Sequence, residues 1–313
     1  MKHNHIYNKN KTKNVKSARS IILFIIIAAF VVGSSTLMAL KFSDSKQAVQ
    51  ALDINKETNS ESSDEDSTNN KNESSSNLSS LENDPVADDI AFVEKYLDQQ
   101  MKGQMPDGAD GKKVAYLTFD DGPSETVTPL ILDTLKAENV KATFFVVGKA
   151  VDESDITKDL IKREVDEGNA IGNHTYSHNY NYLYPNKTVS VDNFMADVNK
   201  TNQSLKNILG ENFSTRAIRF PGGHMTWKGM GDMDIAMKEK DYHQVDWNAL
   251  SKDAEGKPKN AEQLKQELIK TVTGRQKAVI LMHDTYGKEE TAKALPEIIN
   301  YLREQGYEFR TMK

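Results

Sequence analysis

Short apolar runs alternate with longer amphipathic segments from residue 112 to the end of the chain. The runs are rich in β-branched and aromatic residues and end at glycine, proline or polar residues, which predicts buried strands. They lie at residues 114–119, 142–148, 170–175, 217–220, 243–247, 278–283 and 307–311. Apolar residues at helical spacing predict helices at residues 128–139, 156–168, 191–209, 233–240, 261–272 and 295–305.

This alternation predicts one α/β domain over residues 112–313. Parallel strands need crossover connections, and the helices between the strands supply them. The first strand ends at the sequence Asp120-Asp121-Gly122-Pro123 and not at a glycine-rich turn of the nucleotide-binding type. We therefore expect a distorted (β/α) barrel of about seven parallel strands, in preference to an open doubly wound sheet.

The beginning of the chain follows a different pattern. Residues 1–19 carry six lysine or arginine residues and no acid, and residues 20–40 are uncharged and largely apolar. A helix of about twenty such residues crosses a bilayer, and its basic flank stays in the cytoplasm. We expect a cytoplasmic tail at residues 1–19 and a single-pass anchor in the cell membrane at residues 20–40, with the rest of the chain extracellular. A cleaved signal peptide and secreted form is the alternative, because the most apolar part is short.

Two further segments connect the anchor to the α/β domain. Residues 41–84 consist mainly of Ser, Asn, Glu and Asp, and they predict a disordered extracellular linker because they cannot bury enough apolar surface to fold. Residues 85–111 contain one apolar stripe at helical spacing and then several glycines, which predicts a helical lead-in to the domain. Such a tether lets the domain reach a substrate away from the bilayer.

Composition narrows the chemistry that the domain can use. The chain has no cysteine and a net charge of −6. Disulfides and thiolate metal sites are therefore excluded, so histidines and carboxylates must hold any metal. The mild excess of acid opposes a general nucleic-acid binder, and nothing in the sequence indicates an obligate protein partner.

Reactive side chains stand at the ends of the predicted strands. Asp120 and Asp121 follow the first strand, and the ends of later strands carry His174 with His178, Arg219, Asp246 and His283. In parallel α/β folds the carboxyl ends of the strands form the edge at which catalysis takes place. A lone Asp-Asp-Gly is more often an ordinary acidic turn, but a reactive group at nearly every strand end favours an active site.

Three of these residues form a candidate metal site. His174 and His178 are four residues apart, so both imidazoles can face one ion across a helical turn. Asp121 at a neighbouring strand end completes a set of two histidines and one carboxylate, which is typical of a catalytic divalent ion such as zinc. Without Asp121, an ordinary pair of histidines would be the better interpretation.

The remaining groups suit hydrolysis of an acyl bond. Asp120 can take a proton from water as the base, and His283 can protonate the leaving group as the acid. Asp246 could hold the imidazole of His283 in the required tautomer, and Arg219 could pair with Asp120 and keep its pKa low. The alternatives are a structural ion pair for Arg219 and a core histidine for His283.

Five motifs at these positions resemble, in order, those of the polysaccharide deacetylases, the NodB-homology domains of carbohydrate esterase family 4. The chain most resembles the membrane-anchored peptidoglycan N-acetylglucosamine deacetylases of Gram-positive bacteria. The motifs are residues 118–123 (TFDDGP), 174–178 (HTYSH), 219–223 (RFPGG), 246–247 (DW) and 281–283 (LMH). The resemblance covers residue 112 to the C-terminus. It implies a distorted barrel that deacetylates N-acetylated sugars with Zn²⁺ or another divalent ion such as Co²⁺, Mn²⁺ or Ni²⁺.

The resemblance implies the same catalytic and metal-binding residues and adds a substrate-binding set. Pro221 and Gly222 belong to the third motif, and the backbone N–H of Gly222 would bind the oxyanion. Trp247 and Leu281 would wall the acetyl pocket. Family members often have an aromatic residue where this chain has Gly222, so the wall on that side is missing. Nearby residues that could replace it are His224, Met225 and Trp227.

The expected substrate follows from the topology and the resemblance together. A domain tethered outside the membrane meets peptidoglycan first, so N-acetylglucosamine in the cell-wall glycan is the leading substrate. Its deacetylation leaves a cationic amine, which would alter recognition of the wall by lysozyme. The alternatives are an O-acetyl esterase or a deacetylase of xylan, chitin or N-acetylmuramic acid. An inactive wall-binding module is a further alternative, which the complete set of catalytic groups opposes.

Overall fold

The computed structural model describes residues 86–313. The basic tail, anchor and linker predicted at residues 1–19, 20–40 and 41–84 lie outside this part of the chain. Within residues 86–313, no helix has the length and apolar character needed to cross a membrane.

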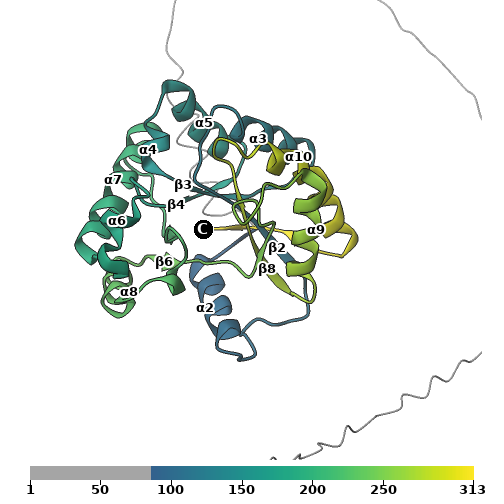
Figure 1. Cartoon of the computed structure of the whole chain (residues 1–313), viewed down its shortest axis with the longest axis horizontal. Helices are drawn as coiled ribbons and strands as arrows, with labels where there is room; N and C mark the ends of the chain where they lie inside the picture. The colour runs from purple at the N-terminus through teal and green to yellow at the C-terminus, as the bar shows by residue number, and fades with distance from the viewer. Residues whose placement is uncertain (1–85) are drawn as a thin grey trace, which may run out of the picture. The chain divides into compact units, whose positions relative to one another are not determined.

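One curled sheet of parallel strands forms the centre of the domain (Figure 1). Seven strands pair in the order β6-β5-β4-β3-β2-β8-β7, and β9 pairs with the beginning of β2. Their bounds are β2 Val114–Asp120, β3 Thr143–Val146, β4 Ala170–Asn173, β5 Ala217–Ile218, β6 His243–Gln244, β7 Ala249–Leu250, β8 Lys277–His283 and β9 Glu308–Phe309. The prediction of a parallel α/β sheet is therefore confirmed.

The expected barrel of about seven parallel strands is present as a curled half-barrel that does not close. Strands β6 and β7 end the pairing order, and within residues 86–313 they do not pair with each other. Asn248, which lies between these two strands, turns instead to β8. Its side-chain amide donates to the carbonyl of Lys277 at 2.9 Å and accepts from the N–H of Val279 at 2.9 Å. The segment between β6 and β7 is thus bonded to β8, and the sheet remains a half-barrel.

Helices cover the outer face of the sheet (Figure 1). The longer ones are α3 Thr128–Ala137, α5 Asp155–Asp166, α7 Val191–Leu209, α8 Met230–Glu239, α9 Ala261–Val272 and α10 Glu289–Glu304. The shorter ones are α4 Gly148–Val151, α6 Tyr180–Leu183 and the 3₁₀ turns η1 Pro185–Lys187 and η2 His224–Thr226. Helix α10 begins six residues before the predicted start and runs through Pro296. Its stripe of buried residues, which includes Ala292, Leu295 and Ile299, holds it against the core despite the proline.

The two faces of the sheet have different roles. Leu117 and Phe119 of β2 point outward and join the core beneath the helices. Val114 and Tyr116 point inward, where they pack against helix α2 Ile90–Met101. A two-stranded pairing of β1 Ala87–Asp88 with β10 Thr311–Met312 holds the start of this segment. Helix α2 thus fills the inner face at the amino ends of the strands and leaves the carboxyl ends open.

Candidate active site

The turn after β2 places the neighbouring carboxylates of Asp120 and Asp121 in different environments. Asp120 is the last residue of β2 and is 2% exposed, whereas Asp121 is partly exposed and has a left-handed backbone with φ of 72°. Oδ1 of Asp121 lies 3.4 Å from Nε2 of His174 and 3.3 Å from Nε2 of His178. Ligand atoms of these three residues all lie within 4.8 Å of one another. The structure therefore brings together the three residues predicted as metal ligands.

The chemistry of this cluster fits a divalent cation. Oδ1 of Asp121 is buried and has no hydrogen-bond partner within residues 86–313. Nδ1 of His174 donates to the carbonyl of Arg219 at 2.8 Å, which leaves the lone pair of Nε2 directed at the cluster. Burial lowers the pKa of His174 to about 3, so this imidazole is neutral and can act as a ligand. Unpaired acceptors that converge on one point are what a bound cation requires.

A carboxylate on α7 holds the turn that carries the histidines. Oδ2 of Asp197 accepts from the N–H of Tyr176 at 3.0 Å, the N–H of Ser177 at 2.7 Å and the hydroxyl of Ser177 at 2.8 Å. These three bonds fix the backbone between His174 and His178. The role of Asp197 has no signal in the sequence, because an acid within an amphipathic helix looks like any solvent-facing residue.

The buried side chain of Arg219 holds Asp120 by a hydrogen bond. The Arg219 side chain is fully buried, and its Nη1 lies 2.7 Å from Oδ1 of Asp120 and 2.7 Å from the hydroxyl of Thr118. Arg219 therefore pairs with Asp120 as predicted, but the pKa of Asp120 is raised and not lowered. Burial raises the pKa of Asp120 more strongly than the positive charge of Arg219 lowers it. A carboxylate with a raised pKa is a better proton acceptor.

His283 lies at the end of β8, next to the end of β2, and its partner is Asp253. Nδ1 of His283 donates to Oδ1 of Asp253 at 2.9 Å, and the backbone N–H of His283 donates to Oδ2 at 2.8 Å. Burial alone would lower the pKa of His283. The hydrogen bond and the charge of Asp253, followed by the charges of Asp120 and Asp121, outweigh burial and raise it to about 9. This imidazole is therefore positively charged at neutral pH.

The predicted role of Asp246 needs correction. Its Oδ1 accepts from the backbone N–H of His224 at 3.0 Å, and its carbonyl accepts from Arg219 at 3.3 Å. Asp246 follows β6, at one end of the pairing order, whereas Asp253 follows β7, which pairs directly with β8. The partner of His283 therefore comes from the adjacent strand. Asp246 instead organises the loop of Gly222 and Gly223.

Most of the predicted site residues line one cavity of about 310 Å³ at the carboxyl ends of the strands. Its lining includes Asp120, Asp121, His174, His178, His283, Gly222, Trp247 and Leu281, together with Tyr180, Phe220, Leu250, Lys252, Asp253, Ala254 and Glu255. Arg219, Asp246 and Pro221 are not in its lining. The backbone N–H of Gly222 has no acceptor within residues 86–313.

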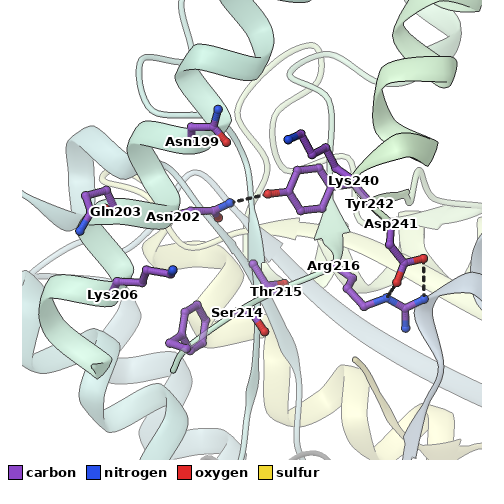
Figure 2. Close-up of a pocket in the computed structure, with 11 residues that line it drawn as sticks. Asn199, Asn202, Gln203, Lys206, Ser214, Thr215, Arg216, Lys240, Asp241 and Tyr242 are labelled. Carbon is purple, nitrogen blue, oxygen red and sulfur yellow. Dashed lines mark hydrogen bonds and ion pairs between the residues drawn. The ribbon is translucent and has the colours of Figure 1, made fainter. Parts of the chain in front are cut away.

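A second cavity, of about 480 Å³, lies near the amino ends of β5 and β6. Figure 2 shows that α7 forms one side, with Asn202 donating to the hydroxyl of Tyr242 at 2.9 Å, and that Arg216 pairs with Asp241 on the other. None of the predicted catalytic residues lines this cavity. The candidate active site is therefore the cavity at the carboxyl ends.

A curled parallel sheet with two acids and three histidines at its carboxyl edge defines a hydrolase with a candidate metal centre. Residues 107–231 match the family described as "Polysaccharide deacetylase". A peptidoglycan-N-acetylglucosamine deacetylase of Bacillus cereus is 36% identical over 220 residues, which cover 67% of this chain and 74% of that protein. The chain belongs to the polysaccharide deacetylases, the NodB-homology domains of carbohydrate esterase family 4.

Two further proteins are similar to this chain. The peptidoglycan-N-acetylglucosamine deacetylase PgdA of Listeria monocytogenes is 33% identical over 229 residues, which cover 72% of this chain. The match spans only 44% of the length of that relative. The solved structure of a carbohydrate esterase family 4 esterase from Streptococcus mutans is also similar. The match covers 73% of this chain and 92% of that chain, with 34% sequence identity and a TM-score of 0.66.

Proposed function

We propose that this chain is a divalent-metal-dependent deacetylase that removes N-acetyl groups from N-acetylglucosamine in cell-wall peptidoglycan. The observation that supports this most is the cluster of Asp121, His174 and His178, which shares one cavity with Asp120 and His283. The names of the Bacillus and Listeria relatives support the choice of sugar and polymer. The anchor predicted at residues 20–40 supports a site of action outside the cell membrane.

Asp121, His174 and His178 would hold the ion, and Asp120 and His283 would move protons. A bound divalent ion polarises a carbonyl and makes water more acidic. Oδ1 of Asp120 is held by Arg219, so its Oδ2, which lies 3.7 Å from Nε2 of His174, is the atom that accepts the proton of water. Nδ1 of His283 is engaged by Asp253, so its Nε2 donates the proton to the departing amine.

Other groups of the cavity orient the acetyl group. The unpaired N–H of Gly222 is available to stabilise negative charge on the carbonyl oxygen. Trp247 and Leu281 give the lining an apolar part that suits a methyl group. Pro221 acts indirectly, because its carbonyl accepts from the indole N–H of Trp227 at 2.9 Å and so fixes the turn before Gly222.

The test is an acetate-release assay with the full-length chain and Zn²⁺. Purified peptidoglycan and oligomers of N-acetylglucosamine should yield acetate and free glucosamine, and the Asp120→Asn variant should yield neither above background. O-acetylated xylan, assayed in parallel, separates N-deacetylation from ester hydrolysis. Absence of acetate from every N-acetylated substrate, with metal supplied, would refute the proposal.

A further inference from the structure

A series of contacting aromatic rings, here called the aromatic wall, leads from the core to the active-site cavity. Tyr184 is 2% exposed and stacks on Trp227, with ring centroids 3.9 Å apart and an angle of 6° between the planes. The ring centroids of Trp227 and Tyr180 lie 5.3 Å apart in an edge-to-face arrangement, and those of Tyr180 and His178 also lie 5.3 Å apart. The wall therefore runs from the core to the candidate metal ligands. Its last tyrosine, Tyr180, is 45% exposed and lines the cavity.

Local hydrogen bonds hold Tyr180 in this place. Tyr180 is the first residue of α6, and the side chain of Asn179 caps this helix by accepting from the N–H groups of Asn181 and Tyr182. Asn193 of α7 donates to the carbonyl of Tyr182 at 2.8 Å. These bonds fix the backbone of α6, and the contacts of the Tyr180 ring with His178 and Trp227 define the position of the side chain.

The wall occupies the space above Gly222. A Cβ atom added to Gly222 would lie 3.2 Å from Cζ2 of Trp227 and 3.3 Å from the hydroxyl oxygen of Tyr180, and Gly222 has φ of +80°. The glycine therefore leaves room for two aromatic side chains from elsewhere in the chain. The Tyr180 hydroxyl lies beside Gly222, whose N–H is unpaired, and within residues 86–313 this hydroxyl has no hydrogen-bond partner of its own.

A tyrosine in this position suits a saccharide. Its ring offers an apolar face, and its hydroxyl offers a hydrogen-bond donor at the end of the same rigid side chain. We propose that Tyr180 is a substrate-binding residue that positions the acetylated sugar, with its hydroxyl donating to the sugar and its ring, supported by Trp227, forming the wall over Gly222. This inference rests on the proposed deacetylase function.

The chain offers a matched control for testing this role. Tyr182 lies two residues further along α6, is 41% exposed and does not line the cavity. Tyr180→Phe and Tyr182→Phe therefore remove the same hydroxyl from the same helix at similar exposure. We expect the Tyr180→Phe variant to raise KM for N-acetylglucosamine oligomers about tenfold, with kcat within about twofold of wild type, because the contact is made equally before and during reaction. Tyr180→Ala should lower kcat/KM further, and Tyr182→Phe should match wild type.

Two readouts separate this inference from the proposed function and from a structural role. Calorimetric binding of an N-acetylglucosamine tetramer to the Asp120→Asn protein, with and without Tyr180→Phe, measures the contact without turnover and should show about tenfold weaker binding. The melting temperature and the bound metal should be unchanged. The role of Tyr180 would be overturned if Tyr180→Phe had the same kinetics and binding as Tyr182→Phe. A loss confined to kcat, or a loss of metal, in Tyr180→Phe would overturn it as well. Absence of acetate release by wild type would instead refute the deacetylase function, and the binding comparison would still test Tyr180.

Discussion

Replacing Asp253 by asparagine removes one negative charge beside His283 and keeps the shape of the side chain. In the wild-type protein, Asp253 accepts from the ring and the backbone of His283 and from the hydroxyl of Thr291 at 2.9 Å. The amide can preserve part of this geometry. It cannot stabilise the positive imidazolium to the same extent.

The size of the effect follows from the pKa of His283, which is about 9 against an ordinary value of 6.5. Such a difference corresponds to about 3 kcal/mol in favour of the charged form. Without the charge of Asp253, burial is opposed only by more distant carboxylates, so the pKa of His283 should fall to about its ordinary value or below. At pH 8 the charged fraction would drop about thirtyfold, and the rate that depends on it would drop in proportion.

The measurement is the pH dependence of kcat/KM for acetate release. In the wild-type pH profile, the basic limb should lie near the pKa of His283, which is about 9. In Asp253→Asn this limb should move to lower pH. The same interaction stabilises the folded protein below pH 6.5 and is lost as the pH rises through about 9, so the variant should be destabilised most at low and neutral pH.

Asp246→Asn is the matched control, because the sequence alone predicts Asp246 as the hydrogen-bond partner of His283. This variant should leave the basic limb where it is, since Asp246 bonds to the backbone of His224 and not to His283. A basic limb that moves in Asp246→Asn and stays in Asp253→Asn would refute the assignment.

Four other substitutions test the rest of the site. Asp121→Asn should lower the bound metal measured by elemental analysis, whereas Asp120→Asn should keep the metal and lose at least about a hundredfold in acetate release; equal metal loss in both would contradict the division of roles. Arg219→Met should cost about 3–5 kcal/mol in urea unfolding at pH 7, because it leaves Asp120 buried without its cation. That cost should shrink as the pH falls through the raised pKa of Asp120, and a cost independent of pH would argue against the pair. Gly122→Ala should lower the free energy of unfolding by about 1–3 kcal/mol, since the new Cβ would lie 2.1 Å from Oδ2 of Asp284; unchanged unfolding would show that Asp284 moves aside.

Sequence alone could predict the part of the site that is continuous along the chain. The strand that ends at Asp120, the acid that follows and the breaking Gly122-Pro123 are adjacent, so periodicity and turn chemistry locate them together. The pair of His174 and His178 is local in the same way.

The remainder depends on contacts between distant segments. Strand β7 has two residues and no periodic signal, so its pairing with β8 could not be predicted. That pairing is what brings Asp253 to His283, thirty residues further along the chain. The bonds from the side chain of Asn248 to β8 likewise have no signature in the sequence.

The pairing of β1 with β10 places the start of the described chain far from the catalytic opening. Residue 86 enters beside the amino end of β2, because the N–H of Thr311 donates to the carbonyl of Val86 at 3.2 Å and β9 pairs with Val114 and Ala115. Asp120 stands at the other end of the same strand, roughly 20 Å away at the usual rise of a strand. Residue 86 and the catalytic opening therefore lie toward opposite ends of the same strand, so a connection made at residue 86 does not begin at the opening.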